Sequence, residues 1–227
     1  MPKTIGVLGG LGPEATVDFF ARLVHSTSAE KDQQHLHIVI DDNPQIPDRS
    51  DFIIGKGRDP TPELIQTAKN LEKAGADLIS IPSATTHYFY PQITKSVTVT
   101  VLNLIGETLN YTLEKMPGIK AVGLLATDGC VRAGLYQNEF SKKGVKVIAP
   151  TQESQERAMR AIIDIKAGKE ANEGELQQVL SELGDGGAEA VILGCTEFCF
   201  GFKGTPPVPA INSSQALAEA TLREARN

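Results

Sequence analysis

The sequence predicts an α/β protein made of two pseudosymmetric domains with parallel sheets, and an active site in the cleft between them. Two observations lead to this prediction. Short apolar, β-branched runs alternate with longer amphipathic segments along all 227 residues, as in strands connected by helices. In addition, residues 75–85 return as residues 187–197, so that Ser83 and Cys195 end equivalent strands. Two reactive groups placed in this way can face each other across a cleft.

The individual elements follow from the same alternation. Strands are predicted over residues 3–9, 36–41, 77–81, 97–101, 120–125, 145–148 and 189–193, with a weaker one near 207–211. Helices are predicted over residues 14–29, 61–74, 103–115, 131–143, 152–167, 173–184 and 213–225. Because open parallel sheets bind ligands beyond the carboxyl ends of their strands, these ends are where site residues are expected.

The internal repeat extends beyond the two nucleophile strands. Ile5-Gly-Val-Leu-Gly-Gly resembles Val122-Gly-Leu-Leu-Ala-Thr, and Glu63-Leu64 corresponds to Glu175-Leu176. The repeat predicts a first domain of residues 1–102 plus a returning C-terminal segment, 210–227, and a second domain of residues 103–209.

Composition excludes several classes of protein. The net charge of −6 and the absence of a Lys/Arg cluster argue against nucleic-acid binding. No apolar run approaches the length of a membrane span, and no signal peptide is recognised, so a cytoplasmic location is expected. The three cysteines give neither an even disulfide framework nor zinc-ligand spacing, and no metal is predicted.

Several strand ends carry candidate site residues. The loop Gly9-Gly10-Leu11-Gly12-Pro13 could present backbone N–H groups to a carboxylate, or be only a tight turn. It has neither a P-loop ending nor dinucleotide-binding spacing. Cys195 lies at a predicted helix N-terminus, which would lower its thiol pKa, although a silent buried cysteine is the alternative. Arg49 suits bidentate carboxylate binding or is an ordinary surface arginine. Lys166 lies at a helix C-terminus, where the helix dipole alone favours a cation.

Together these residues resemble the cofactor-independent aspartate/glutamate racemase family, most closely its aspartate racemases. The similarity covers essentially the whole chain. Its motifs are Ile5-Gly-Val-Leu-Gly-Gly-Leu-Gly-Pro-Glu-Ala-Thr16, Ile46-Pro-Asp-Arg49, Ile81-Pro-Ser83-Ala-Thr85-Thr-His87-Tyr, Leu125-Ala-Thr127-Asp-Gly129 and Leu193-Gly-Cys195-Thr196-Glu197.

The resemblance implies two pseudosymmetric domains, a homodimer and no pyridoxal phosphate or other cofactor. It implies proton exchange at the substrate α-carbon between two flanking cysteines, of which Cys195 is one. Arg49 matches the arginine that holds the substrate side-chain carboxylate, and Lys166 matches its frequent partner. The resemblance also implies that Thr85, Thr127 and Thr196 hydrogen-bond the substrate backbone groups, and Gly10 and Glu197 are further candidate substrate-binding residues.

Three positions depart from the family pattern. Where the family motif reads Pro-Cys-Asn-Thr-Ala-His, this chain has Pro82-Ser83-Ala84-Thr85-Thr86-His87, so that Ser83 replaces the first catalytic cysteine and Ala84 the substrate-binding asparagine. Cys130 stands where Thr is common, as a possible auxiliary residue near the substrate. His87 could polarise the Ser83 hydroxyl or merely pack.

The sequence therefore predicts racemisation of an acidic amino acid, with aspartate favoured over glutamate. Some family members with a hydroxyl residue at the first position work strongly in one direction, and the same is possible here. Two alternatives remain open. One is a one-cysteine enzyme of the same superfamily, either an arylmalonate-type decarboxylase or a maleate-type isomerase. The other is a racemase-like binder or variant without turnover.

Overall fold

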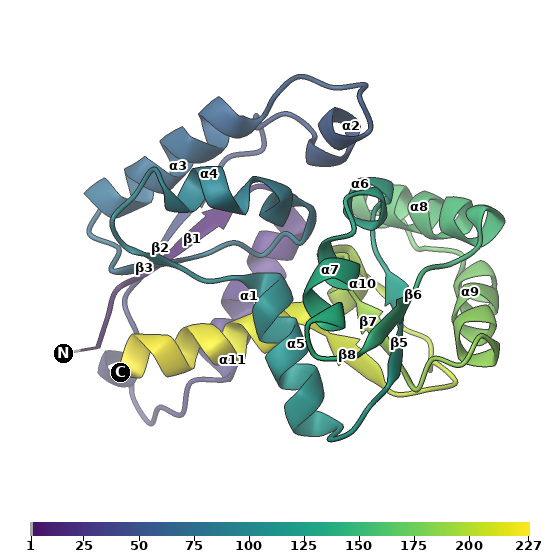
Figure 1. The fold of residues 1–227 in the computed structure, drawn as a ribbon. Helices are drawn as coiled ribbons and strands as arrows, with labels where there is room; N and C mark the ends of the chain where they lie inside the picture. Colours follow the sequence, from purple (N-terminus) through teal and green to yellow (C-terminus); the bar gives the residue numbers. More distant parts are fainter. Residues whose placement is uncertain (1) are drawn as a thin grey trace.

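The computed structural model describes residues 2–227 and contains two separate four-stranded parallel sheets (Figure 1). The first sheet has the order β2-β1-β3-β4, formed by β1 (Ile5–Gly9), β2 (Ile38–Asp42), β3 (Leu78–Ser80) and β4 (Thr100–Val101). The second has the order β6-β5-β7-β8, formed by β5 (Ala121–Leu125), β6 (Lys146–Ile148), β7 (Ala190–Leu193) and β8 (Ala210–Asn212). The two orders are equivalent, which confirms the predicted pair of α/β halves.

The internal sequence repeat lies in the two inner strands of each sheet, β1 and β3 in the first and β5 and β7 in the second. β1 pairs with both β2 and β3, and β5 pairs with both β6 and β7. All residues of β1, β3 and β7 are buried, because helices cover both faces of a parallel sheet. This explains why these strands read as continuous apolar runs. Ser83 and Cys195 therefore follow strands that occupy the same place in the two sheets.

Helices cover both sheets. Most of the amphipathic segments fold as predicted: α1 (Pro13–His25), α3 (Thr61–Lys73), α5 (Leu104–Lys115), α8 (Gln152–Lys166), α9 (Glu173–Asp185) and α11 (Ser213–Arg226). Across residues 2–227, none of the helices is long and apolar enough to cross a membrane.

The predicted helix over 131–143 is wrong as a single helix. It is divided into α6 (Asp128–Arg132) and α7 (Leu135–Ser141), because Gly134 takes a left-handed conformation with φ of 64° between them. Short helices were also missed, since a single turn has too little periodicity to be recognised. They are α2 (Arg49–Ile53), α4 (Tyr90–Thr94), α10 (Thr196–Gly201) and the 3-10 turns η1 (Asp32–Gln34) and η2 (Thr85–Phe89).

The end of the chain joins the two halves. β8 pairs with β7 in the second sheet, so the predicted return to the first domain at residue 210 is too early. α11 then crosses to the first half, where Thr221 hydrogen-bonds Ser80 of β3 through their hydroxyl groups at 2.7 Å. The N–H of Lys3 donates to the carbonyl of Ala225, which leaves the two ends of the chain close together (Figure 1).

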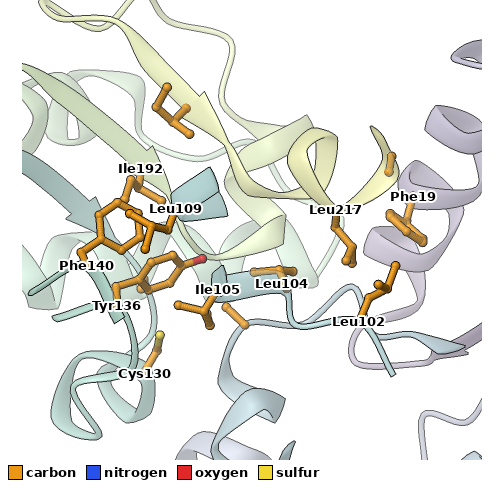
Figure 2. Close-up of a cluster of buried hydrophobic side chains, with 14 of the residues drawn as sticks. Phe19, Leu102, Leu104, Ile105, Leu109, Cys130, Tyr136, Phe140, Ile192 and Leu217 are labelled. Carbon is orange, nitrogen blue, oxygen red and sulfur yellow. The ribbon is translucent and has the colours of Figure 1, made fainter. Parts of the chain in front are cut away.

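The hydrophobic core has three parts. One cluster covers the outer side of the first sheet and another the outer side of the second. The third runs between the halves. Figure 2 shows Leu109 of α5 beside Phe140 of α7, and Leu217 of α11 beside Phe19 of α1. This shared cluster fixes the two sheets in one arrangement, and thereby positions the strand ends that form the site.

Candidate active site

The loops after the strands of both sheets meet around one small cavity. Ser83, which follows β3, and Cys195, which follows β7, both line it. The complete lining is Leu11, Asp48, Arg49, Ser50, Ser83, Thr85, Thr127, Lys166, Cys195 and Glu197. Residues from both halves are needed to build this wall, so the cavity exists only because the two halves meet.

The cavity has little free volume. Its volume is about 20 Å³, which is room for about one water molecule. Hydrogen bonds hold the two halves together at its edge: Thr85 to Thr127 at 2.7 Å, Thr196 to the carbonyl of Pro82 at 3.3 Å, and the N–H of Gly129 to the Ser50 hydroxyl at 2.8 Å. An amino acid is several times larger than a water molecule, so the cavity has to widen to hold one.

Cys195 is a buried thiol bonded to a carboxylate. It caps the N-terminus of α10, and its Sγ donates to Oε2 of Glu197 at 2.8 Å. Burial raises the pKa of the Cys195 thiol well above its usual value, and the negative charge of Glu197 raises it further, while Lys166 opposes this. The expected lowering of this pKa by the helix N-terminus is therefore wrong for this conformation, because a six-residue helix is outweighed by burial and a neighbouring carboxylate.

Glu197 connects the thiol to a cation. Its side chain is buried, and Oε1 lies 3.5 Å from Nζ of Lys166. Lys166 is the last residue of α8, as predicted from the sequence. Burial alone would lower the pKa of Lys166, but Glu197, Cys195 and Asp48 more than compensate and raise it. The result is a continuous thiol, carboxylate and ammonium chain on one side of the cavity.

Arg49 supplies a second cation, held by main-chain oxygens. It begins α2 and is 7% exposed. Nη1 donates to the carbonyls of Ile46 and Pro47 at 3.2 and 3.1 Å, and Nη2 donates to that of Leu11 at 3.1 Å. Nε is buried and has no hydrogen-bond partner within residues 2–227. Burial lowers the pKa of Arg49, although Asp48 and Glu197 oppose the shift; an arginine still keeps its charge. The Nε–H and one Nη2–H therefore remain available to a ligand.

The Ser83 side contains no such charged chain. The Ser83 hydroxyl accepts a hydrogen bond from the Thr86 hydroxyl at 2.8 Å. His87 does not polarise Ser83 through its hydroxyl: the N–H of Leu104 donates to Nε2 at 2.9 Å, so Nδ1 carries the proton and donates to the Ser83 carbonyl at 2.9 Å. Burial lowers the pKa of His87 to about 4. His87 is thus a neutral residue that ties backbone segments together.

Known proteins are similar to this chain in both sequence and fold. The profile of the Asp/Glu/hydantoin racemase family matches residues 8–221. The chain therefore belongs to the Asp/Glu/hydantoin racemase family. A broad-specificity amino-acid racemase of Bacillus subtilis (strain 168), RacX, is 28% identical over 227 aligned residues, which cover 96% of each chain.

Solved structures agree with this assignment. An aspartate racemase from Picrophilus torridus superimposes with a TM-score of 0.83 and 29% identity, covering 98% of this chain and 94% of that one. An aspartate racemase homologue from Pyrococcus horikoshii OT3 gives a TM-score of 0.79 and 26% identity, covering 99% of this chain and all of the other. The predicted family is confirmed.

Two of the three threonines predicted to bind substrate line the cavity. Thr127 caps α6 by accepting from the N–H of Cys130 at 3.2 Å, and it also shares the hydrogen bond with Thr85. Thr196 does not line the cavity; its hydroxyl is used in the bond to Pro82. In this family member it joins the two halves behind the wall.

Four other predicted site residues lie away from the cavity wall: His87, described above, and Gly10, Ala84 and Cys130. The N–H of Gly10 donates to the Thr16 hydroxyl at 2.9 Å, so it is not free for a carboxylate. Gly10 has φ of 82°, and a Cβ there would lie 2.3 Å from the backbone carbon of Asn43, so glycine is required by the turn itself. Ala84 and Cys130 belong to the shared core. Cys130 lies beside Tyr136 in Figure 2, and burial raises its pKa to about 12.

Three wall residues were not predicted from the sequence: Leu11, Asp48 and Ser50. Asp48 and Ser50 flank Arg49, and the Asp48 side chain caps α2 by accepting from the N–H of Asp51 at 2.9 Å. Adjacency to Arg49 was the available signal, but only the path of α2 shows which neighbours turn inward. Nowhere in residues 2–227 do three potential metal-binding His, Cys, Asp or Glu side chains gather.

Proposed function

We propose that this family member racemises an acidic amino acid, with aspartate favoured, by moving protons at the α-carbon without pyridoxal phosphate. One observation carries the proposal: Cys195 and Ser83, from equivalent strand ends, line the same cavity as the cations Arg49 and Lys166. The two proton-carrying groups supply the two faces of one carbon. The two cations supply the charge that a dicarboxylic substrate needs.

Arg49 is proposed to hold the side-chain carboxylate. Its Nε–H and remaining Nη2–H are neighbouring donors, and a carboxylate can accept from both together. Lys166 is proposed as the partner cation and also balances the charge of Glu197. Thr85 and Thr127 can exchange their mutual hydrogen bond for bonds to the substrate backbone when the cavity widens.

Cys195 is proposed as the base. Its thiol proton passes along the existing hydrogen bond to Oε2 of Glu197, and the resulting thiolate removes the α-proton. The carbanion is stabilised by the nearby positive charges of Arg49 and Lys166. A proton delivered to the opposite face from the Ser83 side completes the inversion. Because a serine hydroxyl is a far weaker acid than a thiol, the reverse direction, with Ser83 as base, is expected to be slow.

The residues of the cavity wall support the choice of a dicarboxylic substrate. Two cations, of which Arg49 is buried, suit two carboxylates better than one. The names of the similar proteins include both aspartate racemase and broad-specificity racemase, so the range of substrates needs direct measurement. A homodimer in the cytoplasm, expected from the sequence, remains part of the proposal.

Proton exchange in D2O tests the proposal. Purified protein is incubated with L- and D-aspartate, L- and D-glutamate and L- and D-alanine, and α-deuterium and enantiomer ratio are followed by NMR and chiral chromatography. We expect exchange with aspartate that disappears in Cys195→Ala. Exchange with neither aspartate enantiomer contradicts the proposal.

The same purified protein also tests the alternative function, that of an enzyme with a single catalytic cysteine. Cys195 is the only thiol on the cavity wall, as far as residues 2–227 show, which is the arrangement that a decarboxylase or a cis–trans isomerase of a small dicarboxylate would also use. Turnover of malonates or maleate in the absence of aspartate exchange would favour it.

A further inference from the structure

We propose that Thr86 is a positioning residue that orients the Ser83 hydroxyl as a proton donor toward the cavity. The proposal rests on the function proposed above and adds a residue that does not touch the substrate. Its basis is the hydrogen bond in which the Thr86 hydroxyl donates to Oγ of Ser83 at 2.8 Å. Once Oγ is occupied as an acceptor on that side, the Ser83 proton has to point elsewhere, and Ser83 is part of the cavity wall.

Burial makes this pair well ordered. Thr86 is 0% exposed and Ser83 is 5% exposed, so water does not compete freely for either hydroxyl. The backbone around the pair is held by His87, whose ring bridges the Ser83 carbonyl and the N–H of Leu104. A buried hydroxyl pair with fixed backbone has few orientations available.

The Thr86 hydroxyl differs in direction from the buried threonines inside the longer α-helices. A buried threonine in such a helix can return its hydroxyl to the carbonyl four residues earlier. Thr108, Thr112 and Thr221 all do so, at 2.7 Å. Thr86 follows Ser83 by three residues and bonds the serine side chain instead. The hydroxyl therefore serves position 83 and not the local helix.

The bond also has a chemical consequence. When Ser83 gives its proton to the carbanion, the Ser83 oxygen becomes an alkoxide, and the new C–H bond contains the lost proton. The Thr86 hydrogen bond stabilises this alkoxide, because a donor to the charged form favours that form. Water that enters when the cavity opens restores the serine proton, while the proton taken by Cys195 returns to solvent through Glu197.

The test measures how the carbanion partitions. For the enantiomer whose α-proton faces Cys195, each carbanion formed in D2O is deuterated either on the Ser83 side, with inversion, or on the Cys195 side, with retention. We expect Thr86→Val to lower the ratio of inverted to retained deuterated product by about five- to tenfold, the effect of one lost hydrogen bond. Thr86→Ser keeps a hydroxyl and is expected to retain the ratio within about twofold. A ratio does not depend on the folded fraction, so general damage to the structure would not change it.

A second measurement does not need activity. In Ser83→Cys, the pH midpoint for alkylation of the introduced thiol by iodoacetamide is followed by peptide mass spectrometry, with and without Thr86→Val. The Thr86 hydroxyl should favour the thiolate, so the midpoint is expected to rise by about half to one pH unit when it is removed. If removal of the Thr86 hydroxyl shifts the alkylation midpoint but the wild-type protein shows no α-deuterium exchange, the racemase function is refuted. The hydrogen bond between residues 86 and 83 is then still supported. An unchanged ratio in an active enzyme, or an unchanged midpoint, overturns the role of Thr86.

Discussion

The two strand ends of this protein share a backbone but differ in their chemistry. β3 and β7 occupy the same place in sheets of equivalent order, and each leads to a small side chain on the wall of the cavity. At the end of β7, Cys195 is bonded to Glu197, which lies beside Lys166. At the end of β3, Ser83 is bonded to another hydroxyl, that of Thr86, and the nearby imidazole of His87 is neutral.

This difference shows what the repeat preserves. The internal symmetry places a proton-carrying atom on each side of the cavity, whereas the surrounding residues decide what that atom can do. Cys195 has an acceptor for its proton within hydrogen-bond distance. Ser83 instead has a donor to its oxygen. In the function proposed above, the Cys195 side takes a proton and the Ser83 side gives one.

Removal of Cys195 should have the largest effect. In Cys195→Ala, we expect the rate of α-deuterium incorporation to fall by about 10³-fold or more, because the general base contributes on this order. Thermal unfolding monitored by circular dichroism serves as the folding control. Cys199→Ala is the matched control, since Cys199 lies in α10, shortly after Cys195 and Glu197 in the chain, but donates to the carbonyl of Leu193. Similar losses in both variants would contradict the assignment of the base.

Because of His87, which lies next to the Ser83 segment, the free energy of unfolding should decrease at acid pH. Its pKa is about 4 in the folded protein against an ordinary value of about 6.5. The unfolded chain therefore binds this proton first, and stability present at and above pH 6.5 is lost as the pH falls toward 4, by about 3 kcal/mol. Urea unfolding at pH 7 and pH 4.5, compared with His87→Gln, measures this contribution. A pH dependence that is the same in both proteins would show that His87 titrates normally.

Ser83→Cys should make the two sides more alike. A thiol at position 83 can act as a base, so we expect exchange of the slow aspartate enantiomer to increase by about ten- to a hundredfold, with a smaller change for the fast one. Separate D2O exchange rates for the two enantiomers provide the measurement. If the slow enantiomer gains nothing, the asymmetry does not originate at Ser83.

Glu197→Gln should have the smallest effect, a change in the pKa of the Cys195 thiol. Beyond burial, the charge of Glu197 and its hydrogen bond both raise the pKa of Cys195, whereas Lys166 lowers it. The neutral amide should therefore lower the thiol pKa. The pH dependence of iodoacetamide alkylation at Cys195 is the readout. A higher midpoint in the variant would mean that Glu197 favours the thiolate, and the sign of its effect would be reversed.

The sequence alone determined the fold and placed Ser83 and Cys195 at equivalent strand ends. Apolar β-branched runs separated by amphipathic segments allow few arrangements other than strands covered by helices, and the repeat of residues 75–85 in residues 187–197 fixes the two-sheet architecture. The position of Lys166 at the end of α8 was also predictable, because helix periodicity is a local property. The motifs likewise indicated the family.

The tertiary structure decided which of the candidates meet, and in what state. The N–H of Gly10 donates to Thr16 within its own turn, and Cys130 and Ala84 pack in the core. No local sequence pattern distinguishes these structural roles from substrate binding. The raised pKa of Cys195 depends on burial and on a carboxylate that turns back toward it. Burial keeps His87 neutral by lowering its pKa to about 4, and a backbone N–H from α5 donates to its ring. Such properties arise from contacts between distant segments, and these contacts exist only when the two halves are packed together.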